Sequence, residues 1–335
     1  MSIAVAVDAF PLVCTALSVS DRSLLCHNAL VRRDSLPMVC GYDRCGAEYA
    51  VRDGIPVLLS HDNPTPASAY DDDLAAQAYA EMHFASYLPP PASYSEASGD
   101  PEGADATALA RRLMALPDLT GAFYTKIAEI VLAHCSSRDG LVVDVGCGMA
   151  RMGVELGAHG WTGRYLGLDL SWRFIAQATR VFLAGDTEVR MPTLVDWNPR
   201  SEVVRLDTPT LDPSRSLLAV GDATRMAVPD RSCDVVLGLN LIDRVPNTAQ
   251  AVRELWRCVA PGGILVLADP FDWMGHPADH RMLSFDPIGA WLDEATSVDL
   301  PPDQRSVVFA LRRRDARRIV IFEDEVVVYR RAGGE

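Results

Sequence analysis

LVVDVGCGMARMGVELG, residues 141–157, is the stretch that decides the fold. It begins with strand-forming residues around one acid, Asp144, continues through Gly146 and Gly148, and ends with apolar residues at helical spacing. Glycine allows a tight turn and a close approach of the backbone to a ligand, and the first turn of a helix offers free N–H groups. We therefore expect a strand, a glycine-rich turn and a helix that together bind a small ligand.

Two common ligands of such turns do not match this one. A P-loop for a nucleoside triphosphate needs a lysine directly after its second glycine, and no such lysine is present. A dinucleotide-binding turn needs a third glycine at the position where Arg151 stands. What remains is an acid two residues before the first of two spaced glycines.

The chain divides into three regions by composition. Residues 1–60 hold four of the eight cysteines and indicate a small β-rich domain. Residues 61–107 are dominated by Pro, Gly, Ser and Asp, which predicts a flexible linker or flap with one short helix near residues 74–82. Residues 108–335 alternate apolar strands with amphipathic helices. This alternation predicts an α/β, doubly wound parallel sheet that binds ligands at the carboxyl ends of its strands.

The expected elements of the third region follow from their periodicity. Residues 186–215 exceed an ordinary connection and are interpreted as an insertion, a possible cap over the site. Residues 306–314 read as a final helix or strand, and the last two strands are expected to join at Glu323–Glu325. The other expected helices are 107–116, 121–135, 150–160, 172–185 and 248–259, and the strands are 140–146, 164–171, 217–223, 233–240 and 262–270.

The sequence VVDVGCGMAR, residues 142–151, resembles motif I of the class I S-adenosylmethionine (SAM)-dependent methyltransferases, with Ala150 in place of the last glycine. Asp169, 25 residues after Asp144, is similar to the acid that ends the second strand in that family. Residues 220–245 and 255–270 resemble the segments around the third, fourth and fifth strands. The resemblance covers residues 108–331. It implies a seven-stranded, Rossmann-like methyltransferase sheet and SAM as the cofactor.

This resemblance implies a set of cofactor-binding residues. Asp169 would accept hydrogen bonds from both ribose hydroxyls, and Asp222 with the Ala223 N–H would face the adenine. Asp169 could instead be a helix N-terminal acid and Asp222 a turn residue, while Cys147 and Tyr124 could serve in packing. The expected cofactor-binding residues are Tyr124, Asp144, Gly146, Cys147, Gly148, Asp169, Leu170, Asp222, Ala223 and Asn240.

The cysteine-rich start, residues 23–59, resembles a degenerate form of the zinc ribbon found in some bacterial rRNA guanine methyltransferases and in a eukaryotic methyltransferase-activating subunit. The resemblance implies Cys26, Cys40 and Cys45 as zinc ligands, with Cys14 or His27 as a fourth. The alternative is a decayed ribbon that keeps its shape by packing alone. Its function would be docking or covering the substrate.

Evidence on the methyl acceptor comes from three short segments in the C-terminal part of the chain. LNLIDRV (239–245), ADPFDW (268–273) and the C-terminal strands are distantly similar to methyltransferases of the histidine imidazole, such as that of ovothiol synthesis, although these could be general features of the fold. The similarity suggests N-methylation of a small molecule such as an amino-acid derivative or natural product. The candidate catalytic residues are Asp243, Asp272 and His276, with Asn240, Asp269, Trp273 and His280 nearby in sequence.

Composition narrows the choice of partner. The formal net charge of −14 gives no electrostatic basis for binding nucleic acid or anionic membranes, and no apolar run is long enough to span a bilayer. We expect a cytoplasmic enzyme with reduced thiols and a small-molecule acceptor; the oligomeric state stays open. The alternatives are an rRNA or tRNA methyltransferase, suggested by the ribbon, and a SAM-binding scaffold without turnover.

Overall fold

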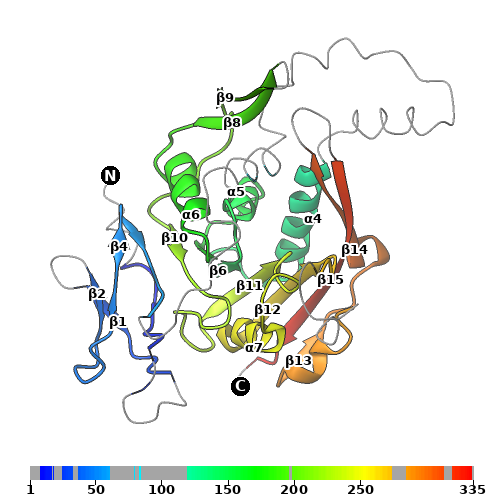
Figure 1. The fold of residues 1–335 in the computed structure, drawn as a ribbon. Coiled ribbons are helices and arrows are strands. Elements are labelled where there is room, and N and C mark those ends of the chain that lie inside the picture. Colours follow the sequence, from blue (N-terminus) through cyan, green and yellow to red (C-terminus); the bar gives the residue numbers. More distant parts are fainter. Residues whose placement is uncertain are drawn as a thin grey trace.

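The computed structural model places a mixed sheet at the centre of the molecule, with helices on both faces and a small β-rich unit at one edge (Figure 1). Among the described residues, no helix has the length and apolarity needed to cross a membrane. The structure describes residues 8–16, 18, 25–32, 37–60, 79, 83, 119–195, 198–273, 284–312 and 319–333.

The sheet has the strand order β10-β7-β6-β11-β12-β15, with β14 and β13 both pairing with the outer edge of β15. The first five strands are parallel and β15 runs antiparallel to β12. The bounds are β6 Leu141–Val145, β7 Arg164–Asp169, β10 Ser216–Val220, β11 Cys233–Leu239, β12 Val259–Asp269, β13 Ala295–Ser297, β14 Ser306–Arg312 and β15 Ile319–Arg331. This order confirms the expected doubly wound, Rossmann-like fold.

Helices cover both faces because successive residues of the central strands point to opposite sides. In β6, Val142 is fully buried against the core that includes α4, α5 and α6, and Val143 is fully buried on the face that α7 covers. The main helices are α4 Leu119–His134, α5 Arg151–Ala158, α6 Trp172–Ala178 with a following π-helical turn Thr179–Leu183, and α7 Thr248–Cys258. Shorter helices are Ile288–Trp291 and α8 Pro302–Arg305.

The C-terminal strand corrects one expectation. The break expected at Glu323–Glu325 is wrong, because β15 runs unbroken through these residues. Asp324 lies opposite Val307 of β14, and Glu325 lies opposite Asp269 of β12. Three consecutive acids resemble a turn locally, but β14 pairs with all three and β12 with Glu325, and this pairing keeps the backbone extended.

The insertion at residues 186–215 contains a β-hairpin. Strands β8 (Glu188–Val195) and β9 (Asn198–Arg205) pair antiparallel in a sheet of their own. In Figure 1 the hairpin lies above α6, away from α7. Its interpretation as a cap over the site stays a prediction.

The N-terminal β-rich unit packs on the β10 edge of the main sheet (Figure 1). Val57 bridges Val220 of β10, and the Leu58 N–H donates to the Val220 carbonyl at 2.8 Å. The unit therefore shares the hydrophobic core on the α7 face. Its strands are β1 Leu30–Arg32, β2 Met38–Cys40, β3 Glu48–Tyr49, β4 Val51–Arg52 and β5 Ile55–Pro56.

Most of the expected linker, residues 61–107, lies outside the described residues, as does the helix expected at residues 107–116. Two residues of the linker are described, Tyr79 and His83, and both are helical. They fall within or next to the short helix expected near residues 74–82.

Candidate functional site

The glycine-rich turn after β6 has an unusual backbone conformation. Gly146, Gly148 and Ala150 have φ values of 73°, 53° and 58°, in the left-handed region that favours glycine. The N–H groups of Gly146 and Cys147 both donate to the Leu168 carbonyl, at 2.8 and 3.0 Å. Ala150 thus adopts the conformation of the glycine that it replaces in the motif, and the turn keeps its shape.

Asp169 joins the end of β7 to this turn. One carboxylate oxygen accepts a hydrogen bond from the Gly148 N–H at 2.9 Å, and the other accepts one from the Ser171 N–H at 2.8 Å. Burial raises the pKa of Asp169 to about 6, against the lowering effect of these backbone donors. The structure therefore brings the acid that ends the second expected strand into contact with the glycine turn of motif I.

Asp144 and Cys147 lie beneath the turn. Asp144 is 2% exposed and accepts a hydrogen bond from the Tyr165 hydroxyl at 2.6 Å; burial raises its pKa to about 7. The Cys147 side chain is buried, and a Cβ built on Gly167 would lie 3.0 Å from its sulfur. These contacts agree with the packing alternative for Cys147, and the hydrogen bond from Tyr165 ties Asp144 of β6 to the neighbouring strand β7.

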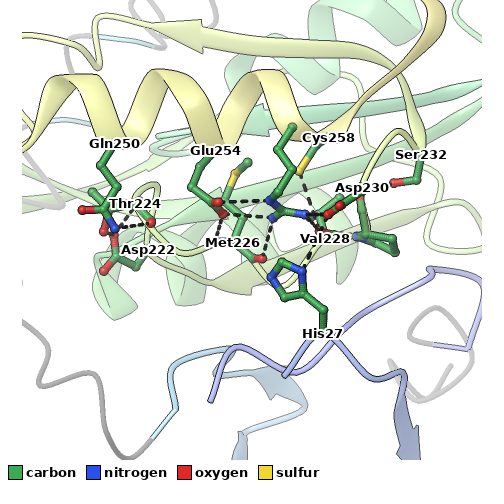
Figure 2. A network of polar contacts seen from close by, with 12 residues as sticks. His27, Asp222, Thr224, Met226, Val228, Asp230, Ser232, Gln250, Glu254 and Cys258 are labelled. Carbon is green, nitrogen blue, oxygen red and sulfur yellow. Dashed lines mark hydrogen bonds and ion pairs between the residues drawn. The ribbon is translucent and has the colours of Figure 1, made fainter. Parts of the chain in front are cut away.

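The segment after β10 carries Asp222 and Ala223. An Asp222 carboxylate oxygen accepts from the N–H and the hydroxyl of Thr224, at 2.8 and 2.7 Å, which is the turn role considered for this residue. The Gln250 side chain of α7 donates to the Thr224 carbonyl at 3.0 Å (Figure 2). The position of Asp222 is thus set from α7.

Arg257 of α7 holds the rest of this segment. Its guanidinium donates to the carbonyls of Val228 and Met226, at 2.8 and 3.2 Å, and pairs with Asp230 at 2.6 Å. The His27 ring of the N-terminal unit lies 3.6 Å from the same Asp230 carboxylate. The N-terminal unit and α7 therefore meet at the segment that carries Asp222.

Two residues that the sequence placed in a linker cover the glycine turn. The rings of Tyr79 and His83 stack with centroids 3.7 Å apart, and a Cβ built on Gly148 would lie 2.8 Å from a Tyr79 ring carbon. The His83 ring is hydrogen-bonded to the Tyr124 hydroxyl at 2.9 Å, and burial lowers the pKa of His83 to about 3. The four-residue spacing of Tyr79 and His83 indicates that both lie on one side of a helix. That spacing does not indicate which part of the molecule the helix packs against.

We expect Gly148→Ala to lower the free energy of unfolding by about 1–2 kcal/mol, because an L-residue is disfavoured at positive φ. The added methyl would also displace the Tyr79 ring. Urea denaturation of both proteins measures the difference. Gly157→Ala is the control, since a Cβ there meets nothing within 4 Å in helix α5, and it should leave stability equal or higher. Equal stability of Gly148→Ala and the wild type would contradict the strain at this turn.

The candidates for acceptor chemistry lie at the carboxyl ends of β11 and β12. Asp269 accepts hydrogen bonds from the N–H groups of Ile242 and Asp243, at 2.9 and 3.3 Å, which joins the two strand ends. Arg244 lies between two candidates, with nitrogens 3.3 Å from a carboxylate oxygen of Asp243 and 3.3 Å from one of Asp272. His276 and His280 lie outside the described residues, whereas Trp273 is buried.

Asp324 joins this group of acids, although its place among three consecutive acids in the sequence gave no sign of a site. It is 0% exposed, and burial together with the charge of Asp269 raises its pKa to about 8. Asn240, which follows β11 with φ 51°, has a side-chain amide that lowers this pKa. The pKa of Asp269 is about 7 and that of Asp243 about 6, in both cases raised mainly by burial.

These raised pKa values predict a loss of stability with rising pH. An unfolded aspartate has a pKa of about 3.9, so between pH 6.5 and 8 the folded protein binds more protons than the unfolded chain. The free energy of unfolding should then fall by about 1–3 kcal/mol across this window, as Asp144, Asp269 and Asp324 ionise. Urea denaturation of the ligand-free protein tests this.

The control variants separate this effect from general charge repulsion. Asp324→Asn should reduce the slope of stability against pH, whereas Asp303→Asn, at an exposed ion pair with Lys126, should leave it unchanged. Stability that rises from pH 6.5 to 8 would contradict the prediction.

Four cysteine sulfurs meet in the N-terminal unit. Those of Cys14, Cys26, Cys40 and Cys45 all lie within 4.8 Å of one another, and the Cys14–Cys45 and Cys26–Cys40 pairs are 3.6 Å apart. All four are free thiols. In tetrahedral zinc sites with Zn–S bonds of about 2.3 Å, sulfurs are about 3.8 Å apart. The donor set therefore fits zinc, and the fourth member of the cluster is Cys14, whereas His27 is not part of it.

Polar groups around this cluster point toward the sulfurs. The Asn28 amide donates to Cys26 at 3.1 Å, the Tyr42 N–H to Cys40 at 3.4 Å, and the Tyr49 hydroxyl to Cys14 at 3.3 Å. Such donors stabilise thiolate charge and orient metal ligands.

Comparison with known proteins finds a family model that matches the central part of the chain. Residues 143–267 match the family model described as a methyltransferase domain. The matched segment covers 125 of the 335 residues. It includes the glycine turn, Asp169, Asp222 and the carboxyl ends of β11 and β12, and together with the strand order it supports a class I methyltransferase.

Similarity to individual proteins is short or distant. A stretch of 51 residues is 47% identical to 2-methyl-6-phytyl-1,4-hydroquinone methyltransferase of Synechocystis; it spans 15% of this chain and 16% of that protein. A methyltransferase from Methanococcus maripaludis, described as SAM-dependent and putative, is 18% identical over 51% of this chain and 66% of its own, with a TM-score of 0.35. YcgJ of Bacillus subtilis is 11% identical over 62% and 99%, with a TM-score of 0.43.

Proposed function

We propose that this protein binds SAM and transfers its methyl group to a nitrogen atom of a small molecule, such as an amino-acid derivative or natural product. The observation that carries the proposal is the Asp169 carboxylate, held against the Gly148 N–H within a methyltransferase domain. A dinucleotide-binding or triphosphate-binding turn would carry a different residue pattern at the same place.

The residues around the turn fit the parts of SAM. The two oxygens of Asp169 can accept hydrogen bonds from vicinal ribose hydroxyls, while Asp222 and the Ala223 N–H lie on the segment expected at the adenine. Gly146 and Gly148 let the backbone approach the amino-acid tail, with Tyr79 above the turn. Bound SAM supplies an electrophilic methyl group; the protein's contribution is to align the acceptor and exclude water.

Asp243, Asp272 and His276 are proposed as the residues that orient the acceptor or take its proton. The net charge of −14 favours a small acceptor over RNA. The faint similarity to imidazole methyltransferases supports a nitrogen acceptor atom. The hairpin at residues 186–215 is proposed as a cap.

We further propose that residues 1–60 form a zinc-ribbon-like domain that holds zinc through Cys14, Cys26, Cys40 and Cys45. The four converging sulfurs and their three polar donors support this. Zinc here would be structural, because four thiolates leave no open coordination position.

Calorimetry with S-adenosylhomocysteine (SAH), followed by methyl transfer from SAM labelled in the methyl group, tests the proposed activity. The label should pass to a compound in the small-molecule fraction of a cell extract and not to total RNA. Transfer of the label to RNA would instead show that the acceptor is a nucleic acid and not a small molecule. SAH binding without transfer to any fraction would favour a scaffold without turnover.

A further inference from the structure

Two carboxyl groups near the carboxyl ends of β11 and β12 are fully buried. Asp243, just after β11, and Asp324, in β15, are both 0% exposed. By strict hydrogen-bond geometry none of their four carboxylate oxygens has a partner among the described residues; the polar side chains next to them are the Asn240 amide at Asp324 and the Arg244 guanidinium at Asp243. Asp269, which lies between them in the sheet order, is by contrast bonded to backbone N–H groups. Buried polar groups in native proteins are rarely left in this state.

The local charge is unbalanced as well. Arg244 pairs with Asp243 and Asp272, whereas Asp269 has no ion pair in the part of the chain that the structure describes. Asp324 has no ion pair among the described residues, and the charges of Asp269 and Asp243 both act on it. A buried carboxylate is strongly unfavourable unless it is protonated or paired with a positive charge. A positively charged ligand would supply that pairing.

The spacing of the carboxylates distinguishes between kinds of cation. Among the described residues, only the four cysteines bring three or more metal-ligating atoms within 4.8 Å of one another. The carboxylate oxygens of Asp243, Asp269 and Asp324 do not converge in this way, so they do not form a metal site. A larger organic cation with several N–H donors suits separated carboxylates better.

The neighbours of Asp324 fit an organic ligand. The Asn240 side chain is adjacent to it and directly follows β11, the strand that pairs with β6 and so borders the glycine turn. Phe322 is two residues before Asp324, on the same face of β15, and its ring stacks with that of Phe309. Carboxylates and aromatic rings are the side chains that bind organic cations.

We propose that Asp324 and Asp243 bind the positively charged group of the methyl acceptor, which is therefore a basic small molecule carrying an amine, guanidine or imidazole group. This inference rests on the proposed methyl transfer and concerns recognition of the acceptor alone. The positive charge of the acceptor pairs with Asp324, which has no ion pair of its own among the described residues. The two carboxylates therefore discriminate against neutral and acidic compounds of the same shape.

The test uses the full-length protein saturated with SAH at pH 8.5, with phenethylamine and the isosteric alcohol 2-phenylethanol as probes. Calorimetry should give at least about 10-fold tighter binding of the amine. Asp324→Asn and Asp243→Asn should each remove most of this preference while leaving the affinity for SAH unchanged. Glu323→Gln is the matched control, since Glu323 is the preceding residue of β15 and is exposed.

Equal binding of amine and alcohol would overturn the inference, and so would the absence of binding by either up to about 10 mM. A preference that survives both asparagine variants would overturn it too. These results leave the proposed cofactor function standing, because SAH binding is measured in the same proteins. A wild-type protein that does not bind SAH would instead refute the proposed function, and the inference with it.

Discussion

Replacing Asp169 with alanine is expected to weaken SAM and SAH binding by about 100-fold. Two hydrogen bonds from ribose hydroxyls to a carboxylate contribute roughly 3 kcal/mol together, and each 1.4 kcal/mol corresponds to a factor of ten in affinity. The variant also loses the acceptors of the Gly148 and Ser171 N–H groups, which shape the turn before the ligand binds. Isothermal titration calorimetry with SAH measures the change.

Asp212→Ala is the matched control for this experiment. Asp212 accepts a hydrogen bond from the N–H two residues ahead, Ser214, at 2.9 Å, as Asp169 does from Ser171. It lies at an exposed turn before β10, so SAH affinity should remain that of the wild type. Unchanged affinity in a folded Asp169→Ala protein would rule out the ribose role, and circular dichroism establishes the folded state.

Replacing Cys14 or Cys40 with serine is expected to remove the bound metal and destabilise the N-terminal unit. The wild type should contain about one zinc per chain by mass spectrometry of the purified protein, and either variant should contain close to none. Structural zinc contributes its binding free energy to folding, so the melting temperature should fall markedly. The core shared with the β10 edge carries this effect into the main domain.

Cys135→Ser separates this effect from the loss of any thiol. Cys135 follows α4, far in sequence from the cluster, and its sulfur is partly buried against the Leu132 carbonyl. The zinc content of the Cys135→Ser protein should equal that of the wild type. A wild-type protein that lacks zinc when prepared without chelators would refute the metal site and favour a ribbon held by packing alone.

The strands and helices of the main domain were predictable because local periodicity reports burial. Helices α4, α5 and α7 and strands β6, β7, β10, β11 and β12 lie where the apolar patterns indicated. The pattern was inadequate at Glu323–Glu325, where three acids in a row gave no sign that β12 and β14 would flank the chain. Strand pairing is a long-range property that a short window does not contain.

Within the candidate site, the sequence located motif I and the acids that follow the strands, and their roles in binding remain predictions. It did not find the covering residues. Tyr79 and His83 stand in a segment whose composition indicates a linker, and their importance depends on contacts with Gly148 and Tyr124. Cys14 was one of two options for a fourth metal ligand, and the choice over His27 required the distances between sulfurs.

By itself, the sequence determined the α/β class, the order of the elements and the glycine turn, because these follow from periodicity and from residues close together in the chain. Only the tertiary structure brought Asp324 to Asp243 and Asp269, closed the four-cysteine cluster and set the Tyr79 ring on Gly148. Each of these depends on burial and on contacts between distant segments. Desolvation and proximity then turn ordinary acids and thiols into groups that can bind a cation or a metal.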